Sequence, residues 1–159
     1  MRTRVSTNAY AAKRALRDRF REITADPSGL FADWVVSYGD PGTFGEGLML
    51  YGGGVLFDQT GDEDLVDGPD TLVHEIAVHG WHIRVEQAPI PGDEREPVEA
   101  TDELAEAAGD ALAQCLAENP RLAGGHSVSR IVGGQCDHYV TDTSAVSVLT
   151  LRISVESDI

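Results

Sequence analysis

The stretch LVHEIAVHGWHIRVEQAPIPGDEREPVEATDELAEAAGDALAQCLAE, residues 72–118, contains the two periodicities that decide the fold. Residues 72–87 carry five apolar side chains on one face of a strand, and Leu72, Ile76 and Val78 on the other, which predicts one long strand. Residues 88–96 are rich in proline and charge and predict a connector. Residues 97–118 repeat apolar side chains at spacings of three and four, which predicts the strongest helix. The strand parity is Val73, Ala77, Trp81, Ile83 and Val85, and the helix stripe is Val98, Thr101, Leu104, Ala105, Ala108, Leu112, Cys115 and Leu116.

Toward the N-terminus, the pattern predicts an amphipathic helix and then short strands. The helix runs from Ser6 or Thr7 to Ile23, with a Ser/Thr/Asn cluster able to cap its start. Its apolar stripe is Ala12, Leu16, Phe20 and Ile23. Residues 30–38 (LFADWVVSY) predict a strand because aromatic and β-branched side chains dominate them. Residues 48–51 and 55–57 predict strand pieces interrupted by three glycines, which indicate a bulge or a close backbone approach.

Toward the C-terminus, the pattern predicts strands only. These cover residues 128–132, 135–140 and 145–155, with a break at Gly133 and Gly134. The predicted order is therefore helix, strands, helix, strands. We expect residues 1–159 to form a single α+β domain, in which a mixed or antiparallel sheet carries two main helices packed on it.

Composition excludes several classes of protein. The chain has 159 residues, of which 42% are hydrophobic and 25% charged, as in ordinary globular domains. No apolar run approaches the roughly 18 residues of a membrane-spanning helix. The Arg-rich start lacks the apolar stretch of a secretory signal, so we expect it to belong to the mature fold.

Charge is distributed very unevenly along the chain. Residues 1–21 hold seven basic side chains and one acidic side chain, a net charge of +6. The remaining residues hold five basic and 26 acidic side chains, a net charge of −21. The total of −15 argues against a free-standing nucleic-acid-binding protein, because phosphates would repel the body of the molecule.

Two interpretations of the basic helix are open. It lies on the acidic body of its own chain, or it contacts the acidic face of a neighbouring copy in a head-to-tail ring. The second interpretation makes Lys13, Arg14, Arg17 and Arg21 candidate subunit-interface residues.

Residues 58–70 (DQTGDEDLVDGPD) hold six acidic side chains and predict an exposed, mobile loop. The EF-hand pattern is not met, because Val66 stands where the third acidic ligand is needed and Asp67 where the glycine is needed. We therefore expect an interface arm or a rim loop. Its candidate interface residues are Asp62, Glu63, Asp64 and Asp67.

No catalytic or metal-binding constellation is present in the sequence. His74 and His79 are five residues apart, whereas H-E-x-x-H requires four so that both rings share one helix face. His74 and His82 share a strand parity but stand too far apart to bind one ion. Cys115 and Cys136 fit small buried hydrophobic residues, and they suggest a reducing compartment. We expect no enzyme activity, no metal and no cofactor.

The order of elements resembles the tail terminator proteins of long-tailed (siphovirus-type) bacteriophages. The resemblance rests on the amphipathic N-terminal helix and four further segments, and it covers nearly the whole chain. These segments are WVVSYGDPG (34–42), HEIAVHGWHIRVEQ (74–87), ATDELAEAAGDALAQCLAENPRLAGG (100–125) and VSVLTLRISVE (146–156). The chain departs from the usual pattern in its strong acidity and in the loop at 58–70.

This resemblance implies a structural virion protein of the tail or neck, made in the bacterial host cytoplasm. Such proteins form a hexameric ring that caps the tail tube, stops its polymerisation and joins the head connector. The implied partners are other copies of the chain, the tail tube protein and the head-tail connector or stopper protein, with no membrane. DNA passes through the lumen without specific binding, and an acidic body suits that passage because like charges repel.

Two other interpretations remain. Another neck or tail component, such as a tail completion or tube-like subunit, would share the element order. A small acidic enzyme or metal-binding domain belongs to a different class, and metal retained after dialysis would favour it.

Overall fold

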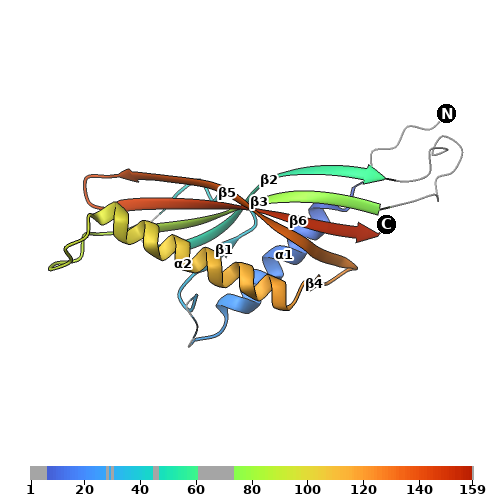
Figure 1. Cartoon of the computed structure of the whole chain (residues 1–159), viewed down its shortest axis with the longest axis horizontal. Coiled ribbons are helices and arrows are strands. Elements are labelled where there is room, and N and C mark those ends of the chain that lie inside the picture. The colour runs from blue at the N-terminus through green and yellow to red at the C-terminus, as the bar shows by residue number, and fades with distance from the viewer. Residues whose placement is uncertain (1–6, 28, 30, 45–46, 61–73, 159) are drawn as a thin grey trace, which may run out of the picture.

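The described part of the chain folds into a six-stranded sheet with two helices on one face (Figure 1). The computed structural model describes residues 7–27, 29, 31–44, 47–60 and 74–158. The strand order is β1-β2-β3-β6-β5-β4, and all neighbours pair antiparallel except β1 and β2, which are parallel. The elements are α1 (Ala9–Thr24), β1 (Val35–Ser37), β2 (Gly47–Thr60), β3 (His74–Gln87), α2 (Pro97–Glu118), β4 (Arg121–Leu122), β5 (His126–Val140) and β6 (Ala145–Asp158). The predicted α+β class, with two helices on a mixed sheet, is confirmed.

The core lies between the helices and the covered face of the sheet. On β3, the odd-numbered side chains from Glu75 to Val85 are buried, so the predicted strand parity is correct for the described residues. Trp81 is fully buried and meets Phe20 of α1 edge to face, with ring centroids 4.8 Å apart. Helix α2 approaches the sheet closely at Gly109, where a Cβ atom would lie 2.6 Å from Cδ2 of Leu149.

The predicted strand at residues 30–38 is wrong for most of its length. Within the described residues 31–38, only Val35–Ser37 forms a strand, and Phe31 and Trp34 are buried just before it. The Trp34 amide donates to the Phe31 carbonyl over 3.0 Å, and the two rings pack 5.3 Å apart. The aromatic side chains therefore anchor a turn under the sheet, although their type is also typical of strands.

The glycine runs do not interrupt the strands as predicted. β2 continues through Gly52–Gly54 with a register shift, so the predicted bulge is confirmed and the interruption is not. β5 likewise continues through Gly133 and Gly134, with a second shift. A Cβ atom on Gly134 would lie 1.6 Å from the Thr150 carbonyl oxygen. Glycine is needed there because two backbones approach closely.

Four further boundaries differ from the prediction, and one short strand is additional. Helix α1 begins at Ala9, and residues 58–60 continue β2 instead of starting the acidic loop. β5 begins at His126, after the unpredicted short strand β4, and β6 ends at Asp158. The rest of the predicted loop, 61–70, lies outside the described residues.

Candidate assembly surface

The position of α1 is fixed by a carboxylate from the sheet. Glu75 of β3 is 1% exposed, and its Oε1 accepts hydrogen bonds from Thr7 Oγ1 (2.8 Å) and the Asn8 amide (3.0 Å). Its Oε2 accepts a hydrogen bond from Gln59 Nε2 over 2.8 Å. The first amides of a helix lack intrahelical partners and attract negative charge, so Glu75 caps α1 from another element.

Lys13 packs inside its own subunit. Its Nζ donates to the Gly53 carbonyl over 3.0 Å and lies 4.3 Å from the centroid of the Tyr38 ring. Burial lowers the pKa of Lys13. This candidate interface residue therefore ties α1 to the glycine bulge of β2.

The other three candidate residues on α1 reach the surface. Arg14 is exposed and has no ion pair within the described part of the chain. Arg17 pairs with Asp18 of the same helix at 3.0 Å, and Arg21 reaches the Val36 carbonyl at 3.5 Å. No contact among the described residues joins these three guanidinium groups to an acidic side chain of another element. The structure thus places all three on one helix, with Arg14 and Arg21 exposed and Arg17 half-buried beside Asp18.

Arg19 has a structural role that the sequence analysis missed. Its guanidinium donates to the carbonyls of Asn119 and Arg121, both at 2.7 Å, and pairs with Glu22 at 3.4 Å. These carbonyls follow α2, which carries no basic residue in its last turn. A cation is favourable at a helix C-terminus, so α1 supplies the charge that α2 lacks. The absence of a basic residue before Asn119 was the available signal.

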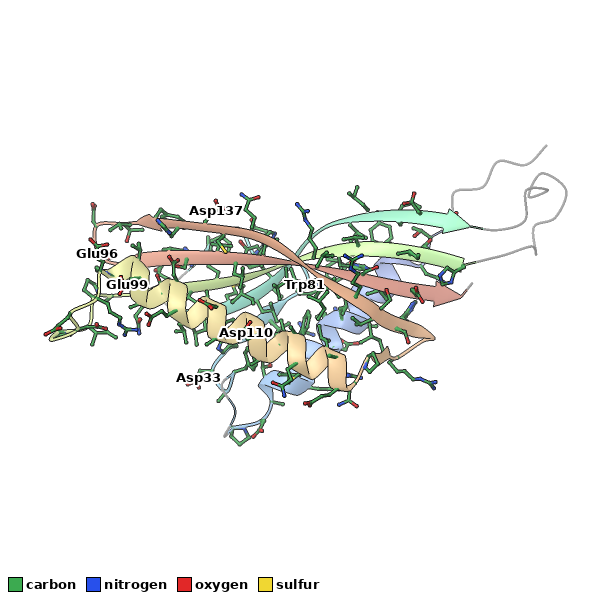
Figure 2. The ribbon with its side chains drawn as sticks, viewed as in Figure 1. Asp33, Trp81, Glu96, Glu99, Asp110 and Asp137 are labelled. Carbon is green, nitrogen blue, oxygen red and sulfur yellow. The ribbon has the colours of Figure 1, made fainter. Side chains whose placement is uncertain are left out.

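Helix α2 presents the opposite charge on the same side of the sheet. Residues 97–118 contain six acidic side chains and no lysine or arginine. Glu99, Glu103, Glu106, Asp110 and Glu118 are exposed. Figure 2 shows Glu99 and Asp110 along this helix and Glu96 just before it. The subunit therefore exposes one basic and one acidic helix.

The uncovered face of the sheet holds a polar and aromatic cluster that the sequence analysis also missed. Arg84 of β3 is only 5% exposed, and it bonds Glu86 Oε1 (2.8 Å) and Tyr139 Oη (3.1 Å). The Phe44 ring lies over its guanidinium, 4.3 Å away. Tyr51 stacks beside Phe44 on the same face. A loop from before β2 thus shields this part of the open face from water.

The other residues singled out in the sequence lie outside the described part of the chain or differ from expectation in their burial. Asp62, Glu63, Asp64 and Asp67 lie outside the described residues. Cys136 is exposed and Cys115 half-buried, so the expectation that both are buried is wrong. In the described ranges, no group of three His, Cys, Asp or Glu side chains is arranged to hold a metal ion. No described helix is long and apolar enough to cross a membrane.

These features define a single α+β domain with oppositely charged helices on one sheet face. A solved structure with a similar fold is a chain of the "Virion of native gene transfer agent (GTA) particle". The TM-score is 0.51 at 18% identity, and the alignment covers 95% of this chain and 100% of that chain. At this identity the likeness concerns the fold. No protein-family model matches, and no curated protein matches.

Proposed function

We propose that this chain is a structural virion protein of a phage-like particle, and specifically a ring-forming tail terminator. The observation that supports it most is the similarity of fold along almost the entire chain to a component of a gene transfer agent virion. The order of elements, which resembles tail terminators, supports the finer assignment. In this role the ring caps the tail tube, stops its polymerisation and offers a joining surface to the head connector or stopper protein.

The exposed charges support head-to-tail contacts between copies. A ring joins two different patches of each subunit, and basic α1 and acidic α2 are two such patches. We infer that Arg14, Arg17 and Arg21 of one copy face acidic side chains of the next. Their partners are the exposed carboxylates of α2 or Asp62, Glu63, Asp64 and Asp67 of the acidic loop. Lys13 contributes indirectly, because its contacts with Gly53 and Tyr38 hold the helix in place.

The strong negative charge also suits a channel for DNA. A net charge of −15 on each copy disfavours phosphate contacts, so DNA passes through the lumen without specific binding. We assign no catalytic step and no cofactor to this function. The site of action is the tail or neck of the particle, after synthesis in the host cytoplasm.

Electron microscopy and light scattering of the purified chain test this proposal. We expect closed rings with a mass near six times 17.1 kDa. Added to polymerising tail tube protein, the rings should bind tube ends and shorten the tubes. Long helical tubes formed by the chain alone would instead identify a tube-like subunit. A monomer at all concentrations, with metal retained after dialysis, would favour the enzyme or metal-binding alternative.

A further inference from the structure

Among the described residues, the sheet has an open edge on each of its two sides. β1 pairs with β2 only at Met49–Tyr51, so residues 55–60 of β2 have no described strand on their outer side. β4 pairs with β5 only at Ser127 and His126, so residues 129–140 of β5 are open in the same way. Unpaired strand edges present rows of backbone donors and acceptors that can pair with another chain.

The side chains along these two edges are complementary. On the uncovered face, β2 carries Leu56, which is 79% exposed, and the exposed Asp58. On the same face, β5 carries the exposed Arg130 and the half-buried Val132. The pairing register establishes the common face, because Leu56, Val78, Ser154 and Arg130 lie in one row across the sheet. Neither Asp58 nor Arg130 has an ion pair within the described residues.

We propose that the open edge of β5 in one copy pairs antiparallel with the open edge of β2 in the next. In the proposed register, Arg130 lies opposite Asp58 and Val132 lies opposite Leu56. One opposite-charge pair and one apolar pair thus stand side by side on the uncovered face. Such cross-strand pairs are the units that stabilise neighbouring strands.

Strand direction and stagger agree with a closed assembly. The order β2, β3, β6, β5 alternates in direction, so an antiparallel contact between β5 and β2 continues the alternation. Within one subunit, Arg130 lies in the row of Leu56, whereas the contact places it opposite Asp58. This offset of two residues supplies the stagger that a closing sheet requires. The contact joins two different edges and is therefore heterologous.

A second copy is the occupant that the observations favour. The two edges belong to one chain, match in charge and apolar content, and lie on opposite sides of the sheet. This inference rests on the proposed ring and names the contact that builds it, alongside the contact of the charged helices.

A charge-swap cycle at Asp58 and Arg130 is the first test. Asp58→Arg and Arg130→Asp each place like charges opposite one another. Each should therefore raise the concentration at which half of the chains are assembled by about three- to tenfold. The double variant restores the attraction, so it should return that concentration toward the value of the unmodified protein. Arg152→Asp is the control, because it makes the same charge change on the central strand β6 and should leave assembly unchanged.

Disulfide cross-linking tests the register directly. The background variant replaces Cys115 and Cys136 by serine. Leu56→Cys combined with Val132→Cys should give a ladder of covalent oligomers on oxidation, because directly opposite Cβ atoms lie about 5 Å apart. Phe57→Cys with Val132→Cys is the control, because Phe57 points to the other face and should give no ladder.

The outcomes separate this inference from the proposed function. Rings that form without a ladder, and that tolerate the single charge reversals, would overturn edge pairing and leave the ring function standing. Disulfide-linked oligomers formed in open filaments would support edge pairing and contradict the proposed tail terminator function. Chains that stay monomeric at all concentrations would contradict both.

Discussion

Helices α1 and α2 lie on the same face of one sheet but are held there by different chemistry. α2 packs through small and apolar side chains, with Gly109 and Ala108 buried against the sheet, and Thr101 Oγ1 lies 2.6 Å from Ser147 Oγ. α1 also buries Phe20, but its ends and flank depend on contacts with distant groups. The comparison shows that both helices are anchored by their buried stripes, and that the basic helix is held in addition by Glu75 and by the contacts of Lys13 with Gly53 and Tyr38.

Removing the aromatic anchor of α1 should have the largest effect. Phe20→Ala deletes a fully buried ring and its edge-to-face contact with Trp81. We expect it to lower the free energy of unfolding by about 4 kcal/mol. Urea denaturation followed by circular dichroism measures the change. A loss below about 1 kcal/mol would show that α1 is not packed on the sheet as described.

The interior beneath α1 should make stability depend on pH. His79 is fully buried, and neither ring nitrogen has a hydrogen-bond partner among the described residues. Burial, with repulsion from Lys13 and His126, lowers the pKa of His79 to about 4. The unfolded chain, in which the pKa is about 6.5, therefore binds more protons between pH 4 and 6.5. The contribution of His79 to the free energy of unfolding should therefore rise by about 3 kcal/mol from pH 4 to 6.5 and stay level above that.

His79→Leu isolates this contribution from that of the carboxylates, which titrate in part of the same range. The variant lacks the ionisable ring, so its stability should rise less between pH 4 and 6.5 than that of the unmodified protein. Denaturant titrations at several pH values measure the difference between the two curves. Two parallel curves would show that His79 is protonated equally in the folded and unfolded chains.

Removing the cap of α1 should lower the free energy of unfolding by less than the two changes above, and more than a matched change in α2. Glu75→Gln removes the charge that accepts the Thr7 and Asn8 hydrogen bonds, so we expect a loss of about 1–2 kcal/mol. Glu99→Gln is the matched control in the exposed first turn of α2, and it should change stability by less than about 0.5 kcal/mol. Equal effects in denaturant titrations would contradict the capping role of Glu75.

The contact of α1 with the end of α2 should have the smallest effect. Arg19→Gln removes the guanidinium from the Asn119 and Arg121 carbonyls, and we expect a loss of about 1 kcal/mol. Hydrogen exchange should quicken in the last turn of α2 and remain unchanged in its first turn. Uniform protection along α2 would show that the Arg19 contact does not stabilise that turn.

The sequence predicted what repeats locally and missed what depends on distant partners. The stripe of α2 and the parity of β3 were correct because burial of one face imposes a period. The prediction of a strand at 30–38 was wrong because the rings of Phe31 and Trp34 are buried in a turn. Aromatic composition alone does not distinguish such a turn from a strand. The capping role of Glu75 and the contacts of Arg84 with Phe44 and Tyr139 could not be found, because these partners are far away in the chain. Arg19 was missed although the lack of a basic residue in the last turn of α2 offered a signal. Gly134 was misread as a break because the backbone approaching it belongs to β6.

The mass of charge-reversed variants tests the assembly account most directly. Arg14→Glu with Arg21→Glu reverses two exposed charges of α1, and Arg121→Glu with Arg152→Glu reverses two exposed charges elsewhere. Light scattering at low salt should show smaller assemblies for the first variant and unchanged rings for the second, with native circular dichroism for both. Because exposed charges are screened over about 10 Å at 0.1 M salt, the difference between the variants should shrink as salt rises. If the folded α1 variant assembles as the unmodified chain does at low salt, α1 packs only on its own subunit and the proposed contact between copies is wrong.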